Sequence, residues 1–433
     1  MPDSLSQPGT AGRSLRIWRV VALIGCGALC IVGSPAATAE AGPVADGGPP
    51  VHGLTVKDGA LWLRGRRYRG IGVNQADLFQ RVIHEPEHDH GHEPQENRAL
   101  ADLRFLGRKK IPFVRFWCCG FWPVDWKLYR ENREEWFSRL DRVVRTAEEA
   151  NVGLIACLFW RPETVSDLCD EFTSAWGDPG SRTREFMATY TRKVVERYRD
   201  SPAIWGWEFA NERNLGCDLP NGMELLGHVS PQLGVNRAKD PRNLVTTETL
   251  AAAMQAFATE VRRHDPNRCI SSGNGLPRGS AWHQASAGSW QADDADQARE
   301  MFRRHNPPPI DLASIHIYPA TEEPRLAGTV GTRPVLELLK AAAATAGQPL
   351  FVGEFSAGGG HTGPATISMD EFRREQTEIL AALAESGVDL AAHWVFALGR
   401  DRTGPGLVRP GNDYEWVLDQ IVEHNARLAA GAE

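Results

Sequence analysis

The chain has 433 residues, of which 42% are hydrophobic and 24% charged, a composition typical of a globular protein rather than a disordered or fibrous one. Its formal net charge is −7, with acidic and basic residues interleaved, which argues against a basic surface for nucleic acid or for an anionic membrane. The length permits one large α/β barrel, because such barrels take about 250 residues or more as a single domain.

The first 39 residues have the order of a secretory signal peptide. Arginines come first, an apolar run follows over residues 20–33, and small residues end at Ala39, where we expect cleavage. The apolar run is shorter than the ~20 residues that span a bilayer, so a membrane anchor is the weaker interpretation. A lipid anchor at Cys26 is a second alternative, because residues 23–26 resemble a bacterial lipobox. We therefore expect a secreted or periplasmic protein with no membrane contact after cleavage.

Residues 40–52 are rich in Gly, Pro and Ala and predict a linker, so the folded domain is expected over residues 53–433. It should open with a β-hairpin, because apolar residues alternate on both sides of Asp58-Gly59 between Leu54 and Leu63. This hairpin could close the bottom of a barrel.

Short apolar strands then alternate with amphipathic helical stretches. Eight segments are predicted as strands, over residues 69–73, 112–117, 152–159, 203–210, 268–273, 312–318, 350–355 and 390–396. Alternating β and α elements predict a parallel sheet, and eight units favour a closed (β/α)8 TIM barrel over an open doubly wound sheet. Glycine-rich phosphate-binding motifs do not follow any of these strands, which argues against a nucleotide-binding protein.

Helical spacing is clearest in two of the stretches between strands. One carries Trp136, Leu140, Val143, Val144 and Ala147 on a single face, and the other carries Leu250, Met254, Phe257 and Val261. Ser368 followed by Glu371 predicts a capping box at the start of a further helix.

The cysteines do not define a disulfide framework. Signal cleavage leaves six, an even number in a compartment where disulfides persist. Cys169 and Cys217 lie in predicted loops and could pair, whereas Cys118, Cys119 and Cys157 are equally consistent with buried free thiols.

Two glutamates lie where a barrel carries its chemistry, at the carboxyl ends of strands. Glu212 follows the fourth predicted strand, and Glu354 lies near the end of the seventh. Two carboxylates across a cleft are what cleavage of a glycosidic bond requires, one to protonate the leaving oxygen and one to attack the anomeric carbon. Either glutamate alone could be a solvated or salt-bridged side chain, but the pair on these strands favours a glycosidase.

The residues around these glutamates carry a resemblance to a known family. The run from Trp207 to Glu212 is similar to the Trp-Glu-Leu-x-Asn-Glu strand of glycoside hydrolase family 5, and Gly353-Glu354-Phe355 is similar to its nucleophile strand. The resemblance extends from Gly53 to the C-terminus. It implies a retaining β-glycosidase in which Glu212 is the acid/base, Glu354 is the nucleophile, and no cofactor is needed.

Four further residues fit this pattern. Arg115, on the second strand, would hold Glu354 ionised, although an ordinary buried ion pair is the alternative. Asn211 could bond the sugar 2-hydroxyl, or be a structural amide. His316 and Tyr318 alternate along the sixth strand and so point to one side, and the resemblance implies that the tyrosine hydroxyl bonds the nucleophile. A core histidine is the alternative for His316.

Tryptophans are the candidates for contacts with sugar rings. The resemblance implies that Trp394, on the eighth strand, is the stacking platform for the reacting sugar. Trp160 and Trp282 lie in or near loops that follow strands and could form subsites, although some tryptophans will be packing residues.

Two features depart from the family's pattern. Arg213 follows the acid/base where the family often has proline, which should alter the course of the loop and leave the catalytic group unchanged. The stretch His84–Glu93 contains four histidines in an acidic context. We expect a flexible loop at the rim, with structural metal binding as the alternative, because the spacing is not that of a helical zinc site.

The substrate is predicted from the same motifs. Residues 207–212 and 314–319 look closest to the mannan-cleaving members of the family, so we expect an endo-acting β-1,4-mannanase that is a monomer and binds a β-linked polysaccharide or oligosaccharide. A β-1,4-glucanase or an exo-acting β-glycosidase is the alternative. Two other classes stay open, namely a non-catalytic carbohydrate-binding barrel and a metal-dependent hydrolase that uses the histidine tract.

Overall fold

The computed structural model describes residues 52–84, 98–319, 325–358, 367–399 and 404–430. The predicted signal peptide and all of the predicted linker except His52 lie outside these residues. Within the described ranges, helices are too short or too polar to cross a membrane.

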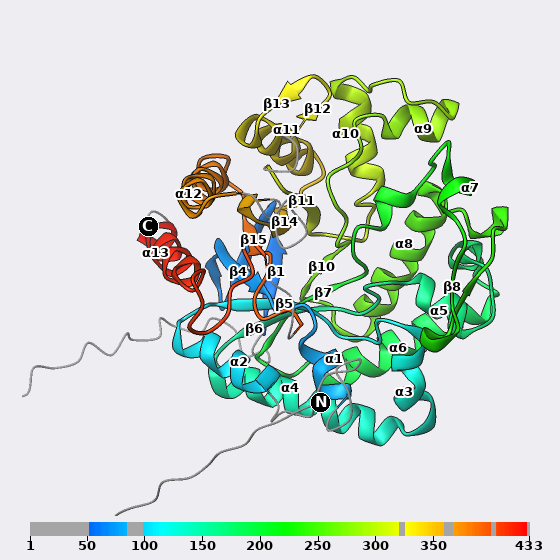
Figure 1. Ribbon diagram of the computed structural model, residues 1–433, viewed down its shortest axis with the longest axis horizontal. Coiled ribbons are helices and arrows are strands. Elements are labelled where there is room, and N and C mark those ends of the chain that lie inside the picture. Colours follow the sequence, from blue (N-terminus) through cyan, green and yellow to red (C-terminus); the bar gives the residue numbers. More distant parts are fainter. Residues whose placement is uncertain (1–51, 85–97, 320–324, 359–366, 400–403, 431–433) are drawn as a thin grey trace, which may run out of the picture. The chain divides into compact units, whose positions relative to one another are not determined.

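Eight parallel strands form the central sheet (Figure 1). In chain order they are β4 (Gly70–Asn74), β5 (Phe113–Trp117), β6 (Gly153–Cys157), β7 (Ile204–Glu208), β10 (Cys269–Ser271), β11 (Ala313–Ile317), β14 (Leu350–Phe355) and β15 (Leu390–His393). They pair in the order β10-β7-β6-β5-β4-β15-β14-β11, and a parallel bridge between Ser271 and Leu312 joins the two end strands. The sheet is therefore a closed barrel, and each predicted strand overlaps an observed one.

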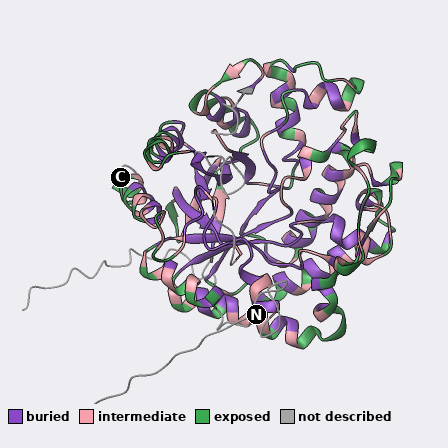
Figure 2. Cartoon of the chain, viewed as in Figure 1, coloured by how far each residue is buried: buried purple, intermediate pink, exposed green. Residues whose placement is uncertain are grey.

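Helices surround the barrel and turn their apolar faces inward (Figure 2). They are α1 (Leu78–Ile83), α2 (Arg98–Arg108), α3 (Lys127–Glu131), α4 (Arg133–Ala150), α5 (Glu163–Leu168), α6 (Arg182–Tyr198), α7 (Gly222–Leu225), α8 (Thr247–His264), α9 (Ala281–Ala287), α10 (Ala295–Arg304), α11 (Thr332–Thr345), α12 (Met369–Glu385) and α13 (Trp416–Ala430). The predicted apolar faces of α4 and α8 are buried. The predicted capping box of α12 is confirmed, because Ser368 accepts from the backbone N–H of Glu371 and Glu371 bonds back.

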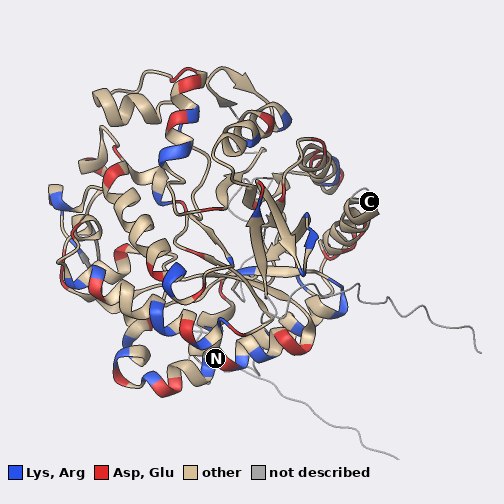
Figure 3. Ribbon diagram, turned by 180° about the vertical axis from the view of Figure 1, so that it is seen from behind, with Lys and Arg blue, Asp and Glu red and all other residues tan. Residues whose placement is uncertain are grey.

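Shorter elements lie at the rim and at the bottom of the barrel. The 3₁₀ turns are η1 (Pro123–Trp126), η2 (Thr173–Gly177), η3 (Arg213–Gly216), η4 (Pro231–Leu233) and η5 (Pro241–Asn243). Two small hairpins, which the sequence analysis did not predict, pair β8 (His228–Ser230) with β9 (Val235–Arg237) and β12 (Arg325–Leu326) with β13 (Thr329–Val330). Basic and acidic residues are interspersed along the outer helices (Figure 3).

The predicted N-terminal hairpin is present, with β1 (Leu54–Lys57) antiparallel to β2 (Ala60–Leu63), and β3 (Arg66–Arg67) adds a third strand. Asp58 and Gly59 both have positive φ, of 52° and 69°, as a tight hairpin turn requires. Leu54 and Leu61 are fully buried and pack against side chains from the beginnings of the barrel strands, including Trp205. The hairpin therefore closes the end of the barrel opposite the strands' carboxyl ends.

The cysteines resolve one open question from the sequence. All six described cysteines are free, so Cys169 and Cys217 do not pair. Five of the six are buried, and only Cys169 is partly exposed.

Candidate active site

The two predicted glutamates meet at the carboxyl ends of the strands. Glu354 is part of β14, and Glu212 lies just beyond the end of β7. A carboxylate oxygen of each lies within 4.8 Å of the other and of His316 Nδ1. Retaining glycosidases hold their carboxyl groups about 5–5.5 Å apart, whereas inverting enzymes leave roughly 6.5–9.5 Å for a water molecule. The close approach of these two oxygens favours the retaining geometry.

Arg115 is the centre of the charge network beneath the site. It is fully buried on β5, and its Nη1 lies 2.9 Å from Glu354 Oε1 while its Nε lies 2.7 Å from Glu208 Oε1. Its Nη1 also donates to Asn74 Oδ1 at 3.1 Å, and its Nη2 donates to Asn211 Oδ1 at 2.7 Å. One planar guanidinium thus fixes two carboxylates and two amides, which a lysine ammonium could not do.

His316 and Tyr318 both face the glutamates, as their alternation along β11 predicts. The Tyr318 hydroxyl donates to Glu354 Oε2 at 2.5 Å. His316 Nδ1 lies 2.9 Å from Glu212 Oε1 and 3.5 Å from Glu354 Oε2. Glu354 therefore receives hydrogen bonds at both oxygens, while Glu212 is bonded through the histidine.

Proton affinities in the site are set by burial and by these partners. Burial raises the pKa of Glu354, the charge on Glu212 adds to this, and His316, Arg115 and Tyr318 oppose it. Burial also acts to raise the pKa of Glu212, but the hydrogen bond from His316, assisted by the charges of His316 and Arg213, lowers it overall. The two carboxyl groups therefore differ in proton affinity, with the pKa of Glu354 above and that of Glu212 below the ordinary value for a glutamate.

Tryptophans form one wall of the site. The Trp160 and Trp394 rings are stacked, with centroids 6.1 Å apart and planes 19° from parallel. The Arg115 guanidinium lies 4.4 Å from the Trp160 ring centroid, so this indole covers the buried charge. Trp394 follows β15 and precedes Val395 through a cis peptide bond.

Trp282 is the predicted site residue that the structure does not bring to the glutamates through any described contact. It lies in α9, its Nε1 donates to Glu300 Oε2 at 3.2 Å, and its ring contacts His283. A role for Trp282 as a distal subsite stays a prediction.

The two departures from the family's pattern have different outcomes. Arg213 begins η3, and its Nη1 lies 2.8 Å from Glu163 Oε1. Of the histidine tract, His84 alone lies within the described residues, and its Nε2 lies 2.8 Å from Asp125 Oδ1. The other three histidines fall outside those residues, so the metal alternative is not tested.

Among the described residues, Glu212, His316 and Glu354 are the group whose ligand atoms gather closely enough to hold a metal ion. Arg115 already supplies a positive charge at Glu354 Oε1. The negative charge of these ligand atoms is therefore already offset by a side chain, Arg115, and the chemistry of the group is that of a carboxylate pair.

Two residues of the site were missed by the sequence analysis, Glu208 and Asn74. Both are fully buried, and both bond Arg115. Asn74 Nδ2 also donates to the Gly353 carbonyl at 2.9 Å, which ties β4 to β14 beside Glu354. A charged residue inside an otherwise apolar strand, as at Glu208, is the feature that could have revealed the first of them.

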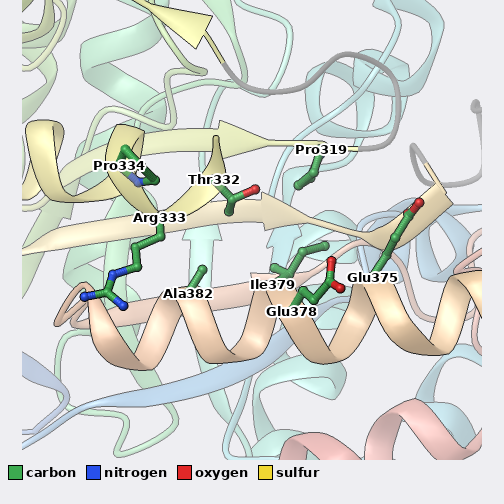
Figure 4. A pocket seen from close by; sticks show the side chains of 8 residues that line it. All are labelled: Pro319, Thr332, Arg333, Pro334, Glu375, Glu378, Ile379 and Ala382. Carbon is green, nitrogen blue, oxygen red and sulfur yellow. The ribbon is translucent and has the colours of Figure 1, made fainter. Parts of the chain in front are cut away.

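A cavity of about 470 Å³ lies elsewhere, between the start of α11 and α12 (Figure 4). Thr332, Arg333 and Pro334 line one side, and Glu375, Glu378 and Ile379 line the other. Arg333 is paired with Glu337 and Glu385, so this cavity presents no arrangement comparable with the carboxylate pair.

A (β/α)8 barrel with a carboxylate pair at the ends of its fourth and seventh strands defines the class of retaining glycoside hydrolases. The family model described as "Cellulase (glycosyl hydrolase family 5)" matches residues 94–396. The chain belongs to glycosyl hydrolase family 5.

Relatives and solved structures agree with this assignment. The chain is 26% identical to mannan endo-1,4-beta-mannosidase 8 of Oryza sativa over 321 residues, which cover 68% of this chain and 77% of that protein. It is 29% identical to a probable mannan endo-1,4-beta-mannosidase C of Aspergillus terreus, in a match covering 30% of this chain and only 27% of that protein. The endo-1,4-beta-mannanase of Rhizomucor miehei shares the fold, with a TM-score of 0.58, 15% identity and coverage of 87% and 99% of the two chains.

Proposed function

We propose that this protein is a retaining endo-β-1,4-mannanase that uses Glu354 as nucleophile and Glu212 as acid/base. The observation that carries the proposal is the asymmetry of the carboxylate pair. Glu354 is held at both oxygens by Arg115 and Tyr318, which orients it for attack, while Glu212 is bonded to His316, a group that can exchange a proton with it.

The reaction then proceeds by double displacement. A Glu354 oxygen attacks the anomeric carbon as the bond to the leaving oxygen breaks, and Glu212 gives that oxygen a proton. The product of this step is a glycosyl ester on Glu354. Glu212, now ionised, takes a proton from water as the water oxygen attacks the anomeric carbon and the ester bond to Glu354 breaks. Glu354 leaves as a carboxylate, Glu212 is protonated again, and both glutamates return to their starting state.

Neighbouring residues support both steps. His316 Nδ1, 2.9 Å from Glu212 Oε1, holds the carboxyl group of Glu212 in place. The side-chain oxygen of Asn211, Oδ1, accepts a hydrogen bond from Arg115 Nη2. The side-chain N–H groups of Asn211 are therefore left to bond the sugar 2-hydroxyl, where hydrogen bonds strengthen in the transition state.

The assignment of mannan rests on the relatives, several of which bear the name mannan endo-1,4-beta-mannosidase. The test is to incubate the purified protein with β-1,4-mannan, β-1,4-glucan and xylan, and with defined oligosaccharides of each. We expect release of short manno-oligosaccharides of mixed length. Preferential cleavage of glucan would replace the substrate assignment, and release of a single short product from chain ends would replace the endo mode.

The catalytic assignment has its own experiment. Glu354→Ala should abolish turnover, and added azide should restore it with a glycosyl azide of inverted configuration as product. Arg242→Gln, at an exposed ion pair, is the control and should retain activity. Treatment with a chelator should leave the rate unchanged. Full activity of Glu354→Ala would overturn the assignment, and loss of activity on chelation would favour the metal-dependent alternative.

We also propose that the enzyme is exported and its signal peptide removed, and that the mature chain is a monomer. The proposal is supported by the order of basic, apolar and small residues over positions 1–39. N-terminal sequencing of the secreted protein should give a sequence that begins after Ala39. A lipid-modified N-terminus at Cys26 would overturn the proposed cleavage after Ala39. Light scattering should give the mass of a single chain.

A further inference from the structure

Glu212 has an unusual backbone conformation. Its φ of 55° and ψ of 28° lie in the left-handed region, which a residue other than glycine rarely occupies. Its N–H donates to the Gly273 carbonyl at 2.9 Å, and its own carbonyl accepts from Leu215 N at 3.1 Å. Residues in such conformations persist where surrounding contacts hold them, and they concentrate at functional sites.

Arg213 bridges this strained position. Its Nε donates to the carbonyl of Asn211 at 2.8 Å, so the side chain after Glu212 bonds the peptide before it. Its Nη1 donates to Glu163 Oε1 at 2.8 Å. The guanidinium therefore links both sides of Glu212 to a separate element, the beginning of α5.

Glu163 is a firm anchor for this link. Its side chain is only 6% exposed, and its Oε1 is also approached by Arg161 Nε at 3.2 Å and by Arg237 Nη1 at 3.7 Å. Burial acts to raise the pKa of Glu163, but the charges of Arg213, Arg161 and Arg237 lower it to about 2. The carboxylate is therefore ionised throughout the pH range in which such an enzyme works.

We propose that Arg213, anchored by Glu163, is a positioning residue that holds Glu212 in the conformation from which it protonates the leaving group. This inference rests on the proposed function, because it takes Glu212 as the acid/base. Arg213 acts through the backbone on either side of Glu212. Its loss should therefore impair proton donation and leave attack by Glu354 intact.

The leaving group distinguishes these two effects. A mannan chain needs a proton from Glu212 on departure, whereas 2,4-dinitrophenolate does not. We therefore compare kcat/KM, which reports the first chemical step, on mannohexaose and on 2,4-dinitrophenyl β-mannobioside. Arg213→Gln and Glu163→Gln should each lower kcat/KM on mannohexaose by roughly tenfold or more, and on the dinitrophenyl substrate by less than about twofold. The double variant should lose little more than either single variant.

Controls separate this effect from loss of structure. Arg242→Gln, at the exposed pair with Asp240, should match the wild type on both substrates. Arg213→Lys keeps the charge but cannot make both bonds, so it should retain the deficit that depends on the leaving group. With the charge removed in Arg213→Gln, the pKa of Glu212 rises, and the limb of the kcat/KM profile that reports Glu212 moves to higher pH.

Equal losses on the two substrates in both Arg213 variants, or additive losses in the double variant, would overturn the positioning role. If Glu212 is not the acid/base, the result is different from that of a failed positioning role. Glu212→Ala would then retain the wild-type rate on mannohexaose. If Arg213→Gln does not fold, Arg213→Lys and Glu163→Gln still carry the comparison.

Discussion

The Arg115 guanidinium lies 2.9 Å from the Glu354 carboxylate, and both side chains are almost completely buried. A buried ion pair is worth little by itself, since desolvation offsets attraction, but removing one partner leaves a charge in a poor environment. Glu208, on the other side of Arg115, is a second carboxylate partner at a distance of 2.7 Å. Glu354 is therefore held by a network that reaches across four strands of the barrel.

Glu208→Gln tests this network. The amide keeps the shape of the carboxylate but removes the charge that faces Arg115 Nε, so we expect the free energy of unfolding to fall by about 2 kcal/mol. Chemical denaturation measures it. Glu337→Gln, at an exposed pair with Arg333 on α11, is the control and should change stability by less than about 1 kcal/mol. Equal stabilities of Glu208→Gln and the wild type would show that Arg115 needs only one carboxylate.

Tyr318→Phe removes the hydroxyl that bonds Glu354 Oε2. That hydrogen bond lowers the pKa of Glu354, so its loss raises the pKa, and the limb of the kcat/KM profile that reports Glu354 should move to higher pH. We also expect kcat/KM at the optimum to fall by roughly 10- to 100-fold, because Glu354 is less well oriented. Movement of this limb to lower pH would contradict its assignment to Glu354.

Glu212→Gln should shift the same limb in the opposite direction. The negative charge of Glu212 raises the pKa of Glu354, so an amide at position 212 lowers it. The profile must be measured with 2,4-dinitrophenyl β-mannobioside, because this variant cannot protonate a sugar leaving group. The two variants together give opposite signs at one titrating group, which a general loss of structure would not produce.

The architecture and the position of the two glutamates were accessible from the sequence, because both depend on local patterns. Strand and helix periodicity located the eight strands, and the barrel rule then selected Glu212 and Glu354 from among 55 acidic residues. The alternation that put His316 and Tyr318 on one side of β11 is equally local. The resemblance to a family supplied the roles, which no periodicity contains.

The features that the sequence did not predict depended on contacts between distant parts of the chain. Glu208 is a charged residue in an apolar strand, but its partner Arg115 is 93 positions away in sequence, so the pairing is not visible from either segment alone. The bond of Arg213 to Glu163 likewise joins η3 to the beginning of α5, and the sequence predicted only that the course of the loop would change. The possible pairing of Cys169 with Cys217 failed for the same reason, because spacing along the chain does not give distance.

Leu61→Ala tests whether the N-terminal hairpin supports stability rather than catalysis. Leu61 is fully buried in the cluster at the bottom of the barrel, so the substitution should cost about 2–5 kcal/mol of unfolding free energy. The glutamates lie at the opposite ends of the strands, and kcat at 25 °C should stay within about twofold of wild type. Leu225→Ala, at a side chain that is 67% exposed, is the control. A large fall in kcat for a folded Leu61→Ala would mean that the two ends of the barrel are coupled.

His393 should make the protein less stable in mild acid. It is buried beside Trp394, and its Nε2 lies 3.0 Å from the Gly406 carbonyl. Burial lowers its pKa from 6.5 to about 4, so the unfolded chain takes up a proton at a pH where the folded chain does not. The contribution of His393 to the free energy of unfolding is therefore complete above about pH 6.5 and is lost as the pH falls toward 4, by roughly 3 kcal/mol at most.

The midpoint of thermal unfolding between pH 7 and pH 5 measures the effect of His393, because most carboxylates stay ionised there. His393→Gln should weaken this dependence, to which the buried His305 and His424 contribute with the same sign because their pKa values are also lowered. His52→Gln, outside the barrel, should leave it unchanged. A wild-type midpoint that rises as the pH falls from 7 to 5 would mean that His393 is protonated in the folded protein.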